Sequence, residues 1–418
     1  SFLRSGYTLS GGAITLGGTN PGLYAITGET ATITSNLLGT GGLTKSGGGS
    51  IRLSGDNSGL TGTLTIAGGA LVVNSANAIP GSGNVIVSAG NSVPSNGNIN
   101  GFTGGQLLLD GSAGGFTVSR NLNIEGRGAG GNSAALISLG NNTLSGTVST
   151  LSSTQSPTTL RNTRITSING MLTLSGTLSV PGAAGTNFSL LGGSNTAGSG
   201  SYNLTGVLSG AGTLEKSGAG TLLLNPSTNS GFTGAIRISG SATGQQSTVR
   251  VTQLTVGSTS VFGASTGTGT GGPIDLNGGV LEFRSNTSLN FNALAGGKNV
   301  YNRAGSTIFT GPALGGSAIN GTVTLGAMQH IVSTTASTAT TTFNSRNGYG
   351  VTLPSVTVDA STSASILTNT LSNAMGGDLT ITGNVTLGDG NTASRPRILS
   401  FSGNGNTVVQ GNLIAGTD

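Results

Sequence analysis

The residues of this chain that could perform acid–base chemistry are few and scattered. Eleven carboxylates are spread over 418 residues, and Asp359, Asp378 and Asp389 are the only three that fall within a short stretch. Glycoside hydrolysis needs two carboxyl groups within about 10 Å of each other. Stacked strands can bring distant residues together, so these aspartates are the candidate carboxylate site of a polysaccharide-degrading enzyme.

His330 is the single histidine, and cysteine is absent. A lone histidine cannot make a multi-histidine metal site, and no cysteine is available to complete one. No motif with serine and aspartate lies near His330 to form a catalytic triad. We therefore interpret His330 as an ordinary strand residue, and we predict that the chain has no catalytic, cofactor-binding or metal-ligating residues.

Lys45 and Lys216 recur in matching contexts, in the segments LTKSG and LEKSG. One interpretation makes them a ligand-binding patch. The alternative, which we favour, places each lysine at a turn or on an outer face, with its aliphatic stem lying along apolar surface and its ammonium group in water.

Composition and motifs exclude several classes of partner. The 16 lysines and arginines, at a net charge of +5, are too dispersed for the basic stripe that binds nucleic acid. The glycine-rich segments lack the Gly-Lys-Ser/Thr motif of a phosphate-binding loop. The Thr-rich run at 333–342 invites comparison with ice-binding threonine arrays, but its Thr-x-Thr spacing is irregular, so we interpret it as a solvated strand.

The pattern of apolar residues predicts many short strands. Only 6% of the residues are Asp, Glu, Lys or Arg, against about 25% in an ordinary globular domain, whereas glycine contributes 78 residues. No glycine-free window has helical spacing, and no apolar run is long enough for a membrane-spanning helix. Apolar residues instead recur in pairs at alternate positions, between turns marked by glycine, with the intervening residue on the other side of the pleat. These pairs are Ile14 and Leu16, Ile51 and Leu53, Leu64 and Ile66, Leu71 and Val73, Val85 and Val87, Leu107 and Leu109, and Leu122 and Ile124.

Internal repetition distinguishes a solenoid from a sandwich or a barrel. The segment 37–53 matches 208–224 without a gap, and 170–180 matches 377–387. In a solenoid each coil stacks about 4.8 Å from the next, and its corners need glycine. Like charges stacked on an outer face would repel, whereas Thr, Ser and Asn can form ladders, which accounts for the low charge.

The segment 214–224, LEKSGAGTLLL, resembles the passenger-associated β-strand repeat of bacterial autotransporters. The segments 43–49, 68–74 and 272–283 are similar to parts of the same repeat. The resemblance implies a right-handed β-helix that is displayed at, or released from, the surface of a bacterium with two membranes. The repeat is informative about fold and export route and not about activity. Because no catalytic residues are predicted, we expect a structural or adhesive role.

We therefore predict an all-β fold, an elongated right-handed parallel β-helix (β-solenoid) without significant helix, in one continuous domain over residues 1–418. Coils of roughly 20 to 30 residues would give on the order of 15 to 20 coils. Because the first residue is Ser1, we interpret the chain as a processed product or a segment of a longer surface protein.

The predicted location is extracellular, and the predicted partners are further copies of the same chain. Strand-like sequence at residues 1–10 and in the C-terminal coil, Thr407–Ala415, suggests head-to-tail association into a filament. Host or matrix surfaces are further candidate partners, whereas nucleic acid and a membrane span are not expected. The alternatives are an adhesin passenger that acts as a monomeric stalk, and the polysaccharide-degrading enzyme described above.

Overall fold

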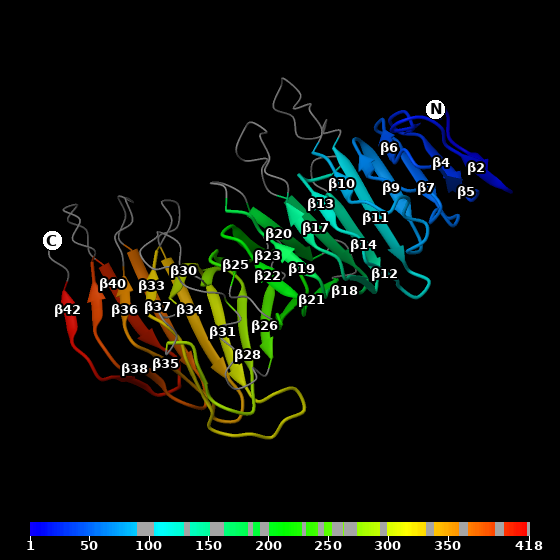
Figure 1. Cartoon of the computed structure of the whole chain (residues 1–418). Helices are drawn as coiled ribbons and strands as arrows, with labels where there is room; N and C mark the ends of the chain where they lie inside the picture. Colours follow the sequence, from blue (N-terminus) through cyan, green and yellow to red (C-terminus); the bar gives the residue numbers. More distant parts are fainter. Residues whose placement is uncertain are drawn as a thin grey trace. The chain divides into compact units, whose positions relative to one another are not determined.

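The structure is a computed structural model that confirms the predicted all-β fold (Figure 1). None of the described residues is in a helix, so none lies in a helix that could cross a membrane. Every pairing described between two named strands is parallel, as in a right-handed parallel β-helix. The described residues are 1–89, 104–128, 134–150, 163–182, 187–192, 200–227, 231–240, 246–252, 262, 274–292, 299–331, 338–358, 367–388 and 397–415.

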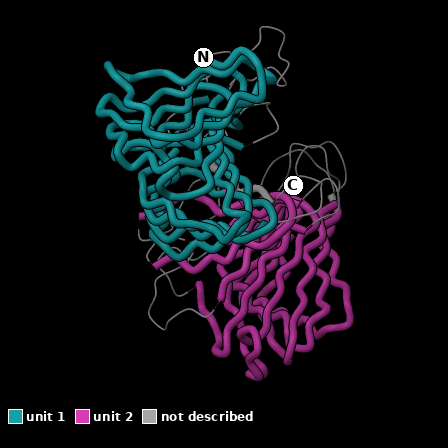
Figure 2. The backbone as a smooth tube through the Cα atoms, turned by 90° about the vertical axis from the view of Figure 1, so that its right-hand side faces the viewer, with its two compact units in different colours: residues 1–214 teal, residues 215–418 magenta. Residues whose placement is uncertain are grey.

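The chain divides into two compact units, Ser1–Leu214 and Glu215–Asp418, coloured separately in Figure 2. In each unit the chain winds repeatedly through three sets of parallel strands, and some coils contribute a named strand to only two of the three sets. The single continuous domain expected over residues 1–418 stays a prediction.

Within each sheet of unit 1, the strands stack in chain order. The first sheet contains β1 (Tyr7–Leu9), β4 (Thr30–Ile33), β7 (Ser50–Leu53), β9 (Gly69–Val73), β11 (Gly105–Gly111), β14 (Leu136–Gly140), β17 (Thr163–Ile168) and β20 (Asn187–Gly192). The second contains β3 (Gly22–Tyr24), β6 (Leu43–Ser46), β8 (Leu64–Ile66), β10 (Val85–Val87), β13 (Leu122–Ile124), β16 (Val148–Thr150), β19 (Thr177–Ser179) and β22 (Val207–Ser209). The third set comprises β2 (Ala13–Thr15) with β5 (Asn36–Leu38), and β12 (Thr117–Val118) with β15 (Asn142–Leu144), β18 (Met171–Leu174) and β21 (Ser201–Leu204).

Unit 2 also consists of three sets of parallel strands, and β23 includes residues on both sides of the division between the units. Its first sheet contains β23 (Thr213–Ser217), β25 (Ile236–Ser239), β27 (Ile274–Asn277), β30 (Val300–Ala304), β33 (Met328–His330), β36 (Val356–Val358), β39 (Val385–Leu387) and β42 (Leu413–Ala415). The second contains β24 (Thr221–Leu224), β26 (Thr248–Thr252), β28 (Val280–Arg284), β31 (Ser306–Gly311), β34 (Thr338–Ser345), β37 (Leu367–Ala374) and β40 (Arg397–Ser402). The third contains β29 (Leu289–Asn290), β32 (Thr322–Thr324), β35 (Gly350–Leu353), β38 (Leu379–Ile381) and β41 (Thr407–Val409).

The core of each unit is a set of apolar columns that run from coil to coil. In unit 1, one column follows the register Ile51, Leu71, Leu107, Leu136, Ile165, and all five side chains are fully buried. Each such side chain contributes about 1.5–3 kcal/mol when it leaves water. Six of the seven predicted apolar pairs are buried in this way. The exception is the pair on β2 and just after it, which is only half-buried because it lies near the N-terminal edge of unit 1.

The outer positions carry hydroxyl ladders, as the scarcity of charge predicted. Thr340 of β34 pairs with Thr370 of β37, and Thr342 pairs with Ser372. Coil length is less regular than expected. The sequence separation between partners in adjacent coils is 20 residues from Leu37 to Asn57 but 38 from Arg237 to Asp275. Positions that meet in space therefore have no fixed spacing in the sequence.

Candidate functional site

The prediction that Lys45 and Lys216 have exposed ammonium groups is wrong. Lys45 lies on β6 and Lys216 on β23, and both side chains are fully buried among the inward-facing residues. Each lysine does lie beside a coil corner, as expected. The ammonium group, however, reaches that corner from the inside of the coil, where it is shielded from water.

Backbone carbonyl groups replace the water that each ammonium group has lost. Lys45 Nζ donates to the carbonyl oxygens of Gly47, Gly49 and Gly68 at 2.7, 2.5 and 2.7 Å. Its three N–H donors are thereby all used. Gly69 leaves the necessary space, because a Cβ atom there would lie 2.5 Å from Nζ and 2.3 Å from the Gly49 oxygen. Lys45 is thus a structural clamp on the corner and not a surface ligand site.

Lys216 makes the equivalent clamp in unit 2. Its Nζ donates to the carbonyl oxygens of Ser217, Gly218 and Ala219 at 2.9, 2.9 and 3.0 Å. Burial lowers the pKa of Lys216 to about 7 and that of Lys45 to about 8. The carbonyl groups oppose this effect, because a charged ammonium group can donate to all three oxygens and a neutral amine to only two.

His330 is a strand residue, as predicted, but its surroundings are polar. It lies fully buried on β33, with its Nδ1 3.4 Å from Asn302 Nδ2. Burial lowers its pKa to about 4, and the nearby Asn369 amide acts in the opposite direction. Asn302 and Asn369 are themselves fully buried, so the ring is neutral at pH 7 within a polar part of the unit 2 interior.

The predicted carboxylate site falls largely outside the described residues. Asp359 and Asp389 lie outside them, as do residues 333–337 of the Thr-rich run. Asp378 is exposed and accepts a hydrogen bond from Asn406 Nδ2 at 3.0 Å. Within the described part of the chain, no group of three or more His, Cys, Asp or Glu residues is arranged to hold a metal ion.

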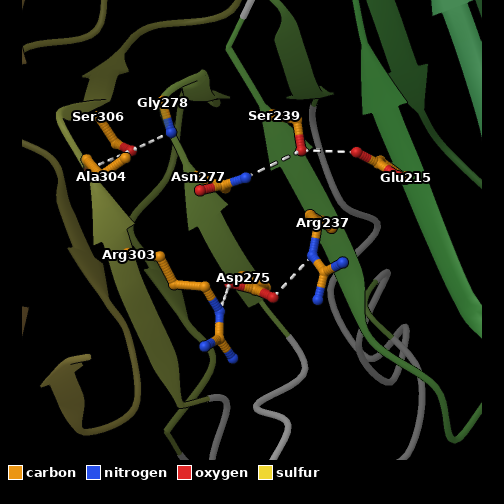
Figure 3. A network of polar contacts seen from close by, with 9 residues as sticks. All are labelled: Glu215, Arg237, Ser239, Asp275, Asn277, Gly278, Arg303, Ala304 and Ser306. Atoms are coloured by element: carbon orange, nitrogen blue, oxygen red, sulfur yellow. Dashed lines mark hydrogen bonds and ion pairs between the residues drawn. The ribbon is translucent and has the colours of Figure 1, made fainter. Parts of the chain in front are cut away.

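Sequence analysis missed a set of ion pairs on the first sheet of unit 2 (Figure 3). Asp275 of β27 is almost fully buried and lies between two arginines on neighbouring strands. Arg237 of β25 donates from Nε to one carboxylate oxygen at 2.9 Å, and Arg303 of β30 donates to the other at 2.7 Å. Ser239, which also lies on β25, donates to Glu215 of the neighbouring strand β23 at 2.7 Å. Arginines and acids therefore alternate across this sheet, two of each sign.

A second group of the same kind lies on the second sheet of unit 2. Arg250 of β26 and Arg284 of β28 donate from Nε to the two oxygens of Glu282, at 2.5 and 2.6 Å. The guanidinium carbon of Arg284 lies 4.4 Å from the centre of the Phe309 ring, a cation–π contact. Register could have revealed both groups, since Arg237 is paired with Asp275 and Arg250 with Glu282. That register depends on coil lengths that the sequence did not supply.

Comparison with known proteins gives one informative similarity. No family model matches the chain, and no solved structure matches it. A segment of 84 residues, 20% of the chain, is 43% identical to part of a protein described as "Adhesin BmaC autotransporter" from Brucella suis biovar 1 (strain 1330). The chain resembles an autotransporter adhesin over that segment. The matched segment covers 2% of the length of that relative.

Proposed function

We propose that this chain is part of an extracellular, adhesive or structural β-solenoid of a bacterial surface, of the autotransporter passenger kind. The similarity to an autotransporter adhesin carries the proposal. The parallel β-helix supports it, because stacked coils form a stable scaffold whose corners and outer faces can vary without disturbing the buried columns.

An adhesion assay tests this proposal directly. Beads coated with the 418-residue chain are expected to be retained on epithelial cell layers or on a matrix-protein surface more strongly than bare beads. The Thr65→Ser variant, which alters a half-buried outer position, should be retained equally well. Leu222→Asp, which places a carboxylate in the core, should lose retention along with the fold. Retention no greater than that of bare beads would refute the adhesive role.

The enzyme alternative has its own test. The purified chain is screened on acidic and neutral polysaccharides for the release of soluble fragments. We expect no turnover. Turnover that is abolished by Asp378→Asn would replace the adhesive proposal with a catalytic one, because Asp378 is the described member of the candidate carboxylate group.

We further propose that copies of the chain associate end to end. The edge strands β1 and β42 carry exposed apolar side chains, with Tyr7 56% and Leu413 70% exposed. An edge strand offers unpaired backbone groups to another chain. Negative-stain images of the purified chain are expected to show long uniform fibres that disappear when residues 1–10 are deleted. Particles that stay one chain long at all concentrations would refute filament assembly.

A further inference from the structure

The two arginine groups of unit 2 differ in their balance of charge. On the first sheet, the two arginines on β25 and β30 both contact Asp275, and Glu215 on β23, which accepts from Ser239 of β25, supplies a second negative charge. Around Glu282, Arg250 and Arg284 share a single carboxylate. The first group is neutral, whereas the second retains one positive charge.

Arg346 lies across Gly311 from Arg284, and so adds a third arginine beside this group. Gly311, at the end of β31, leaves open the space between the two arginines. A Cβ atom on Gly311 would lie 3.0 Å from Arg284 Nη1 and 3.6 Å from Arg346 Cβ. Arg346 is exposed, and no acidic group among the described residues pairs with it. Three arginines and one glutamate thus leave a net charge of about +2 at this place.

Two of these guanidinium groups are held in fixed positions. Glu282, with its side chain 8% exposed, fixes Arg250 and Arg284 through their Nε atoms. The Phe309 ring fixes Arg284 further. Within the described part of the chain, Glu282 is the one acceptor offered to these two arginines. The Arg250 side chain is 25% exposed and that of Arg284 is 10% exposed, so Arg250 presents the more accessible N–H groups. Donors that are already positioned lose little entropy when they bind a ligand.

We propose that the surface formed by Arg250, Arg284 and Arg346, here called the Glu282 surface, binds the sulfate or carboxylate groups of an acidic polysaccharide. Guanidinium groups pair with such anions through two parallel hydrogen bonds. The choice of a polysaccharide rests on the proposed extracellular function. Nucleic acid fits less well, because its closely spaced phosphates need a long basic stripe, and this chain has 16 lysines and arginines in 418 residues.

Direct binding measurements test the proposal. The full chain is titrated with a sulfated heparin-derived oligosaccharide, a carboxylated hyaluronan oligosaccharide and a single-stranded DNA of matched charge. We expect one or both sugars to bind more tightly than the DNA, with an affinity that falls as salt increases. The Arg346→Gln variant, changed at an exposed side chain, should fold normally and weaken sugar binding roughly tenfold or more.

Two control variants separate a specific surface from general charge. Arg4→Gln removes the same charge from an exposed position in unit 1, and Arg237→Gln removes an arginine of the neutral group. Both should bind the sugars as the wild type does. The proposal is overturned if neither sugar binds, if DNA binds as tightly, or if Arg4→Gln weakens binding as much as Arg346→Gln. Bead adhesion is measured separately. If the wild-type chain binds the sugars but its coated beads are not retained, the result counts against the adhesive role alone.

Discussion

The buried lysine clamps predict an unusual dependence of stability on pH. Lys216 has a pKa of about 7 when folded, against the ordinary lysine pKa of 10.5 in the unfolded chain. Below pH 7 both states carry the proton, and the folded state bears the full cost of the buried charge. Between pH 7 and 10.5 the unfolded state binds more protons than the folded state, so stability rises with pH.

The size of this rise follows from the shift in pKa. A difference of about 3.5 units corresponds to about 5 kcal/mol across the window. This value is an upper limit, because the three carbonyl groups stabilise the charged form. For Lys45, with a pKa of about 8, the same reasoning gives about 3 kcal/mol, starting one pH unit higher.

The test compares wild type with Lys216→Met, which keeps an unbranched side chain, one heavy atom shorter, and removes the charge. Urea unfolding is followed by circular dichroism at several pH values from 6 to 10. The wild type should gain stability relative to the variant as the pH rises above 7, and Lys45→Met should show a smaller effect above pH 8. The comparison cancels the ionisation of tyrosines, which is common to all the proteins. Curves that stay parallel over the whole range would refute the assignment of buried, proton-losing lysines.

Three further predictions concern the core and the corners. Leu222→Asp should destabilise the fold by about 3 kcal/mol or more, whereas Thr65→Ser should change the free energy of unfolding by less than about 0.5 kcal/mol; equal effects in urea titrations would contradict the assigned inner and outer faces. His330 has a folded pKa of about 4, so between pH 6.5 and 4 only the unfolded state takes up the proton. The wild type should therefore lose about 3 kcal/mol of stability relative to His330→Gln over that range. A pH-independent difference between their unfolding midpoints would refute this. Gly69→Ala should displace the Lys45 ammonium group and lower the thermal midpoint by several degrees, because the glycine has φ of +65° and no room for a Cβ atom; an unchanged midpoint would contradict the clamp.

The strands and their inner faces could be predicted from the sequence alone. Apolar residues two apart, such as Leu71 and Val73, must lie on one face of a strand, and each such strand is too short to bury its face unless others stack on it. The sparse charge and abundant threonine indicated outer ladders, and Thr340 and Thr370 are such a pair. These features are local, or they repeat along the chain, so they can be read from residue order.

The polar details could not be predicted in this way. A lysine two positions after an inward-facing leucine, as Lys45 is after Leu43, is compatible with either exposure or burial, and only the path of the corner carbonyls decides which. The pairing of Arg250 with Glu282 and of Arg237 with Asp275 depends on register, and the register depends on coils whose lengths vary. Sequence by itself thus determined that the chain forms stacked, charge-poor coils, because alternation and repetition are local properties. Only the tertiary structure decided where its few charges lie, because these charges meet across coils of unequal length.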